Sequence, residues 1–230
     1  MNDVKTHRPI PLVLTTLIAV FSALVALMLS GGHAAHAHGL AAHHTDTHTI
    51  SRSEFALRTD MRKLWEDHVT WTRLAVISLT TGAPDTKATV GRLLQNQTDI
   101  GNAVKPFYGR AAGNQLTQLL KEHILIAADL IAAAKAGDEA KTADAQSQWE
   151  ANADSIATFL SKANPRAWKL AATKAMMREH LRLTTNEVVA RLKAQWSVDV
   201  AAYDRIHVQA LHMADMLSSG IVSQFPARFK

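Results

Sequence analysis

The 230-residue chain contains no cysteine, and this absence excludes several kinds of chemistry. Without thiols the protein forms no disulfide and offers no thiolate to a metal ion or a substrate, so its stability must come from packing. The chain also lacks a G-x-S-x-G segment and a phosphate-binding P-loop, and its serines and histidines form no triad-like pattern. The sequence therefore favours a protein without catalytic activity.

Charge of one sign is not concentrated anywhere along the sequence. The formal net charge is only +5, and no cluster of Lys and Arg with interleaved aromatic residues occurs. Such clusters are typical of nucleic-acid-binding proteins. The sequence therefore does not indicate a nucleic-acid partner.

The first 30 residues have the pattern of an export or membrane segment. Lys5 and Arg8 precede an uncharged, strongly apolar stretch over residues 9–30. That stretch is nearly long enough to span a bilayer and exceeds the apolar core of a usual signal peptide. Its length favours a membrane anchor, although Ala35-His36-Ala37 matches a signal-peptide cleavage site. Either alternative places the remaining chain outside the cytoplasm, anchored to the cytoplasmic membrane or secreted.

Residues 31–50 are rich in Gly, Ala, Thr and His and contain nothing that builds a core. They hold six of the twelve histidines, namely His33, His36, His38, His43, His44 and His48. We expect a flexible linker between the N-terminal segment and a folded domain over residues 51–230. The linker either captures Zn, Cu or Ni weakly or is simply polar.

Residues 51–230 show apolar side chains at helical spacing and no alternation typical of strands. Proline is scarce here, at positions 84, 106, 165 and 226, and each proline suggests a helix boundary. The predicted helices cover residues 53–81, 85–105, 113–136, 138–162, 166–196 and 198–222. We therefore predict an all-α domain, an up-and-down helical bundle built from about three helical hairpins. The rival arrangement is a four-helix core with one helix interrupted near Pro106 to Gly109.

An acidic residue followed by histidine recurs three times at nearly constant spacing. The pairs are Asp67-His68, Glu122-His123 and Glu179-His180, and successive histidines are 55 and 57 residues apart. A polar residue follows each histidine after 27–29 positions, namely Asn96, Asn152 and His207. This recurrence indicates an internal repeat of helical hairpins.

The three histidines lie on apolar helix faces, so they are candidate inner ligands of a metal ion. Neutral imidazole binds Zn and Cu, and helical bundles build such sites from inward-facing residues. Nearby residues extend the candidate set: His207 as a fourth ligand, Asp67, Glu122 and Glu179 as auxiliary ligands or tautomer-holding partners, and His212 beside Asp215. Met176, Met177, Met213 and Met216 would favour copper, although methionine in a helix is often core packing. The competing interpretation is three buried, hydrogen-bonded histidines.

Several stretches resemble a group of exported bacterial helical proteins that have no assigned function. The stretches are EDHVTWTRL, RLLQNQTDIG, LLKEHI, NPRAW, REHLRLT and QFPARF. They cover most of residues 55–229. The resemblance implies an extracytoplasmic helical domain and no particular activity or ligand.

Two hypotheses follow for function. The first is a membrane-tethered, extracytoplasmic bundle that binds copper or zinc through core histidines, for buffering, sensing or delivery of the ion. The second is a structural or accessory subunit that docks on a protein partner in the cell envelope and holds no metal. An enzyme that uses the carboxylates as acid and base has no motif to support it.

Overall fold

The computed structural model describes residues 50–230, and this part of the chain is all-helical. Its elements are α2 (Arg52–Thr81), α3 (Thr86–Ala136), α4 (Glu139–Ala163), α5 (Leu170–Leu192), α6 (Trp196–Gln224) and a 3-10 helix, η1 (Pro226–Phe229). The described residues form no strand, which confirms the predicted fold class for this part. None of these helices is long and apolar enough to cross a membrane. The predicted membrane or signal segment and the six linker histidines lie outside the described residues.

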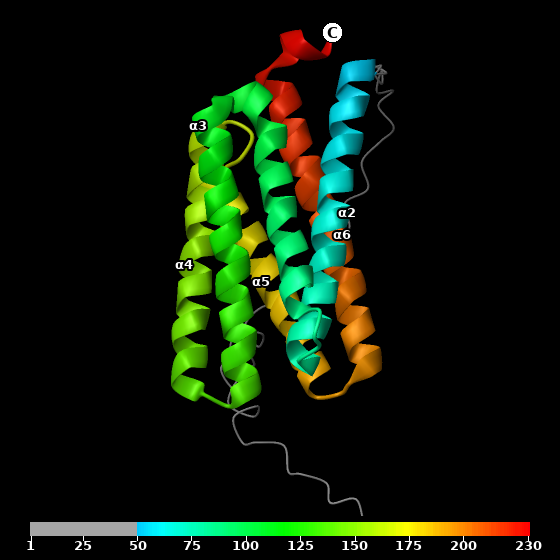
Figure 1. The fold of residues 1–230 in the computed structure, drawn as a ribbon. Helices are drawn as coiled ribbons and strands as arrows, with labels where there is room; N and C mark the ends of the chain where they lie inside the picture. Colours follow the sequence, from blue (N-terminus) through cyan, green and yellow to red (C-terminus); the bar gives the residue numbers. More distant parts are fainter. Residues whose placement is uncertain (1–49) are drawn as a thin grey trace, which may run out of the picture. The chain divides into compact units, whose positions relative to one another are not determined.

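Helix α3 reverses direction at Gly109 and so forms two antiparallel arms, residues 86–108 and 110–136 (Figure 1). Gly109 has φ 84° and ψ 168°, a backbone conformation that is essentially restricted to glycine. Pro106 lies in the last turn before the reversal. The distortion that proline causes in a helix therefore affects only the end of this arm. The predicted gap between residues 105 and 113 is therefore too wide, because a single glycine makes the turn.

The six helical segments run alternately up and down the bundle (Figure 1). Helix α2 packs against α3, the second arm of α3 packs against α4, and α5 packs against α6. Contacts between α2 and α6, and between α4 and α5, close the arrangement. Helix α2 also contacts α5, so the inner faces of the helices are buried against one another in the middle of the bundle.

The two arms of α3 approach closely because glycines face each other. A Cβ atom at Gly101 would lie 1.9 Å from Oγ1 of Thr117 and 2.6 Å from the Gly113 carbonyl oxygen. Only a residue without a side chain fits at this distance. The same constraint acts at Gly220, where a Cβ atom would lie 2.1 Å from Nε1 of Trp168.

The connection between α4 and α5 is longer than the sequence predicted, since α5 begins at Leu170 rather than at 166. Asn164 organises this connection: its Oδ1 accepts from the Ala167 N–H and its Nδ2 donates to the Gly220 carbonyl. Trp168 is then placed against Gly220 with only 2% of its surface exposed. These hydrogen bonds thus hold a non-helical connection where the sequence predicted the first turn of α5.

Candidate functional site

The three repeated histidines come together in the middle of the bundle. His68 lies on α2, His123 on the second arm of α3, and His180 on α5. The His180 ring lies between the other two, with ring centroids 6.1 Å from His68 and 6.2 Å from His123. Three residues that are far apart in the sequence therefore meet at one level of the core.

Each histidine is held by an amide side chain 29 residues later. The distances from Nδ1 are 3.2 Å to Gln97 Nε2 for His68, 2.8 Å to Asn152 Oδ1 for His123, and 3.1 Å to Gln209 Oε1 for His180. The constant separation shows that the hairpins share one register. Asn152, which follows His123 in the repeat noted in the sequence, is one of these partners, whereas His180 is held by Gln209 rather than by the repeat residue His207.

A second hydrogen bond completes the pattern in each hairpin. The amide N–H of Asn96, Asn152 or Gln209 donates to the backbone carbonyl four residues before the histidine, at Leu64, Leu119 and Met176 respectively. In the first hairpin two residues make these hydrogen bonds: Asn96 donates to the carbonyl and Gln97 donates to the ring. The amides of each hairpin thus fix its histidine ring and tie its two helices together.

The hydrogen bonds determine which ring nitrogen carries the proton in two of the histidines. The oxygens of Asn152 and Gln209 can only accept, so Nδ1 of His123 and of His180 must donate. Nε2 of His123 is then an acceptor, and the Trp149 indole N–H donates to it at 3.1 Å. Nε2 of His180 has no hydrogen-bond partner within residues 50–230.

His68 differs from the other two histidines in how its partner is arranged. Nε2 of Gln97 also donates to the Leu93 carbonyl and to Oδ1 of Asn96, so three contacts share two hydrogens. Oε1 of Gln97 is buried without a hydrogen-bond partner in the described part of the chain. This buried oxygen beside His68 can therefore still accept a hydrogen bond.

All three imidazoles are neutral at physiological pH. Burial, followed by the neighbouring His180, lowers the pKa of His68 and of His123 to about 3. Burial also lowers the pKa of His180. A buried imidazole avoids protonation because the charged form loses its hydration. Neutral imidazole is also the form that binds a metal ion.

A cavity of about 50 Å³ lies among these rings. It is lined by His68, His123, His180, Gln97 and three methionines, Met176, Met177 and Met213, together with aliphatic residues and Trp65. Met176 precedes His180 by four residues, so both side chains lie on one face of α5. The cavity has room for a few water molecules or one ion.

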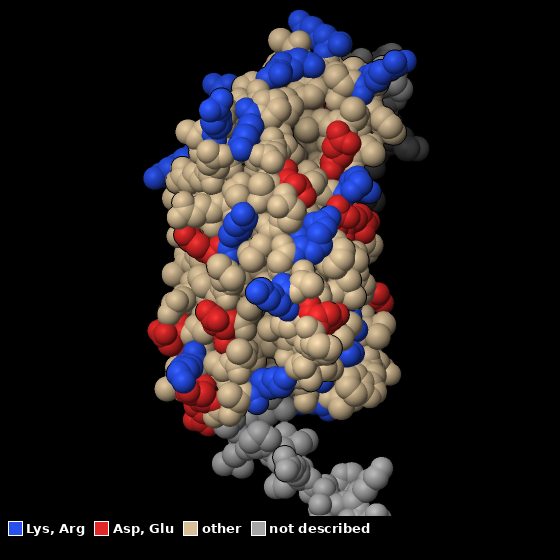
Figure 2. All heavy atoms as spheres, in the orientation of Figure 1, with Lys and Arg blue, Asp and Glu red and all other residues tan. Residues whose placement is uncertain are grey.

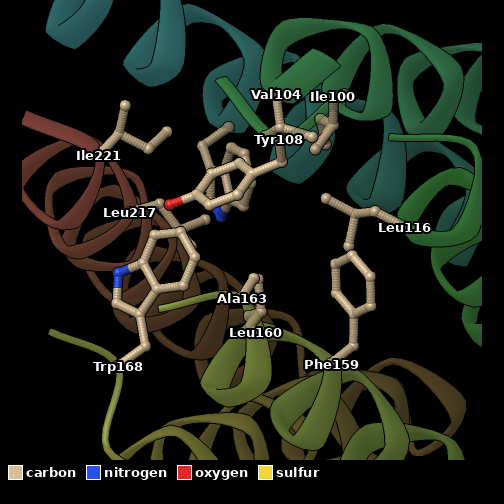
Figure 3. A pocket seen from close by; sticks show the side chains of 11 residues that line it. Ile100, Val104, Tyr108, Leu116, Phe159, Leu160, Ala163, Trp168, Leu217 and Ile221 are labelled. Carbon is tan, nitrogen blue, oxygen red and sulfur yellow. The ribbon is translucent and has the colours of Figure 1, made fainter. Parts of the chain in front are cut away.

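A second, smaller cavity of about 20 Å³ adjoins the first toward the end of the bundle that carries the C-terminus. Figure 3 shows Tyr108, Trp168 and Leu217 on one side of it and Leu116 and Phe159 on the other. Tyr108 donates its hydroxyl hydrogen to Gln224, and burial raises its pKa to about 12. This cavity offers an ion no ligands, so the histidine cavity is the better candidate site.

The acidic residue of each pair points away from the cavity. Asp67 pairs with Lys63 at 3.1 Å, Glu122 accepts from Gln118 at 2.9 Å, and Glu179 pairs with Arg182. Adjacent helical residues diverge by about 100°, so an inward histidine turns the preceding acid outward. None of the three lines the cavity.

His207 and His212 also lie apart from the cavity. Nε2 of His207 lies 2.6 Å from a carboxylate oxygen of Glu66, and its ring stacks on Tyr203. His212 is exposed on α6. Within residues 50–230, no three His, Asp or Glu side chains are grouped so as to hold a metal ion. The expected ligand set is therefore reduced to the histidines around the cavity and the methionines beside them.

The sequence did not reveal a buried ionic cluster near the α5–α6 turn. Arg73 of α2 donates to Glu187 at 2.7 Å and to both carboxylate oxygens of Asp199, and Arg191 donates to Asp199 at 3.1 Å. Burial raises the pKa of Glu187 despite Arg73, whereas the two arginines overcome the effect of burial and lower the pKa of Asp199. Arg191 also lies 4.9 Å from the centre of the Trp196 ring.

Comparison with known proteins gives no relative for this chain. No protein family model, curated protein or solved structure matches it. The functional argument therefore depends on the geometry of the site.

Proposed function

We propose that the bundle binds one monovalent copper ion in the histidine cavity, for buffering, sensing or delivery of copper outside the cytoplasm. The ligands are Nε2 of His180 and sulfur atoms from Met176, Met177 and Met213, whereas His68 carries its proton on Nε2 because Gln97 donates to its Nδ1. One observation carries the proposal. His180 lies between two other neutral imidazoles on a cavity lined by three methionines, and its Nε2 has no partner within residues 50–230.

The donor set favours monovalent copper over zinc. Imidazole with thioether is a soft combination that suits Cu(I), whereas structural zinc is almost always held by four Cys, His or carboxylate ligands. All the cavity donors are uncharged, and the nearest acids of the repeat face outward. A single positive charge costs less than two to bury without an anionic ligand.

His123 has a positioning role in this proposal. Both of its ring nitrogens are occupied, by Asn152 and by Trp149, so it has no lone pair free for a metal ion. Its satisfied hydrogen bonds also support the second hypothesis, an accessory envelope protein whose buried histidines are purely architectural. The two hypotheses differ in what happens when copper is added.

The test uses the full chain with its six linker histidines, at positions 33, 36, 38, 43, 44 and 48, replaced by serine. Anaerobic titration with Cu(I) against a chromophoric chelator should show one bound ion. At a free copper concentration of about 100 times Kd, the free energy of unfolding should rise by about 2.7 kcal/mol.

His180→Gln should lose the copper-dependent stabilisation, and the matched surface variant His212→Gln should keep it. Met213→Leu preserves side-chain volume, so it should fold normally and bind copper more weakly. A protein that gains no stability from Cu(I), or gains as much from Zn²⁺, contradicts the proposal and favours the accessory role.

A further inference from the structure

One end of the bundle carries most of the unpaired positive charge of the described residues. At this end α2 begins, α3 reverses, α4 meets α5, and the chain terminates (Figure 1). We define the cationic end by eight residues: Arg52, Lys105, Arg110, Lys162, Arg166, Lys169, Arg228 and Lys230. Seven of them are exposed and Lys105 is half-buried. Figure 2 shows Lys and Arg gathered at this end, while most Asp and Glu lie farther down.

None of these eight residues forms an ion pair with another described residue. Arg228 does donate to the Pro106 carbonyl and lies over the Phe107 ring. The one acidic side chain in this layer, Glu54, is 3% exposed and already paired with Arg58. The positive charge is therefore uncompensated within residues 50–230, apart from the terminal carboxylate.

The opposite end of the bundle has more acidic than basic residues. Its layer, residues 76–90, 129–144 and 186–199, contains seven acidic residues and five basic ones. Several of these charges are paired, including those of the Arg73 cluster. The bundle is thus electrically polarised along its long axis.

We infer that the cationic end rests on an anionic phospholipid surface. Unpaired Lys and Arg are attracted to anionic headgroups, and nearby apolar side chains can enter the interface. Phe55 and Leu170 supply exposed apolar surface in this layer, at 64% and 43% exposure. The partner chemistry is therefore a charged lipid headgroup with adjacent acyl chain.

The course of the chain agrees with this orientation. Fifty residues precede Ser51, and they include the uncharged apolar stretch over residues 9–30 that the sequence predicts to be membrane-inserted. The helical domain begins at Arg52, at the cationic end. The chain therefore enters the folded domain at its cationic end.

The test exploits the absence of cysteine from the chain. Single cysteines are introduced by Ala227→Cys at the cationic end and by Ala140→Cys at the opposite end, and each is labelled with a fluorophore. The full chain is reconstituted in vesicles that carry a headgroup quencher, with or without phosphatidylglycerol in a phosphatidylcholine background. We expect the probe at position 227 to be quenched in the anionic vesicles and the probe at 140 to remain bright.

The quenching should also fall at 1 M NaCl, where the screening length shrinks to about 3 Å. The triple variant Lys162→Gln, Arg166→Gln and Lys169→Gln should lose most of the quenching. The matched triple Lys87→Gln, Lys193→Gln and Arg205→Gln changes the net charge equally and should keep it. Equal quenching at both probe positions, or quenching that ignores lipid charge, would overturn the inference.

Discussion

The most informative single residues are the buried histidines, because their ionisation is coupled to folding. The pKa of His123 falls to about 3 in the folded protein, mainly through burial, whereas an exposed histidine in the unfolded chain titrates near 6.5. Below pH 6.5 the unfolded state therefore binds more protons than the folded state does. Stability is complete above pH 6.5 and is lost as the pH falls toward 3.

We predict that the free energy of unfolding drops by on the order of 2 kcal/mol for each such histidine between pH 6.5 and 5. Urea unfolding followed at several pH values in this window measures the effect, before most carboxylates titrate. His123→Gln should flatten the pH dependence, and His212→Gln should leave it unchanged. A wild-type protein equally stable at pH 7 and pH 5 would show that the buried rings accept protons without cost.

The amide partners give a second prediction at this scale. Asn152→Ala leaves the buried Nδ1 of His123 without an acceptor and removes the hydrogen bond that ties α4 to the Leu119 carbonyl. Each such loss costs about 1–3 kcal/mol. Denaturant unfolding should therefore show a large destabilisation for Asn152→Ala and almost none for Asn114→Ala, which is exposed on α3. Similar effects of the two substitutions would contradict the structural role of the amide.

The sequence revealed the three core histidines because their recurrence is visible in a single chain. It placed His207 at the third repeat position, where the structure has Gln209; the two residues are only two positions apart, but their side chains point in directions that differ by about 200° around the helix. It missed the ionic cluster because Arg73 is 114 residues from Glu187 and 126 from Asp199. Contacts over such separations depend on the packing of whole helices, which composition and periodicity do not encode.

Among the elements, α3 shows how close packing decides where a helix can bend and what it can contact. Its two arms lie so close at Gly101 that a methyl group would overlap Thr117 and the Gly113 carbonyl. The sequence located the reversal approximately, through Pro106 and the glycines. It overestimated the gap because proline often ends a helix, whereas here the helix continues past Pro106 to residue 108.

Two substitutions on α3 should have opposite effects. Gly101→Ala must push the arms apart and should destabilise the protein by about 1–3 kcal/mol. Gly91→Ala meets nothing within 4 Å and should stabilise it by about 0.4–1 kcal/mol, because alanine favours the helix. Thermal unfolding of both variants measures the contrast. If Gly101→Ala is as stable as Gly91→Ala, the arms are not in close contact.

For the molecule as a whole, the Arg73 cluster joins the first hairpin to the last. Arg73 belongs to α2, while its partners Glu187 and Asp199 belong to α5 and α6. Both carboxylates are 1% exposed; Glu187 depends on Arg73 for compensation, and Asp199 is compensated by Arg73 and Arg191 together. The cluster closes the bundle near the α5–α6 turn.

Arg73→Ala should therefore destabilise the protein by about 3–5 kcal/mol, since it leaves the buried Glu187 without a cation and Asp199 with Arg191 alone. Arg205→Ala, at an exposed position, serves as the control. Hydrogen exchange should show that Arg73→Ala increases exchange most strongly in the residues around the α5–α6 turn. Uniform protection in both variants would mean that the cluster contributes little to closure.

The lengths of the helices determine how far the bundle extends from one end to the other. Helix α2 has 30 residues and spans about 45 Å, starting from the end where the chain enters the domain. A protein that stands on a membrane by that end lifts its α5–α6 turn about as far above the lipid as a bilayer is thick. The turn exposes Trp196 and Val198 at 55% and 52%. In that orientation, a molecule that contacts these side chains lies well away from the membrane surface, beyond the electrostatic influence of its headgroups.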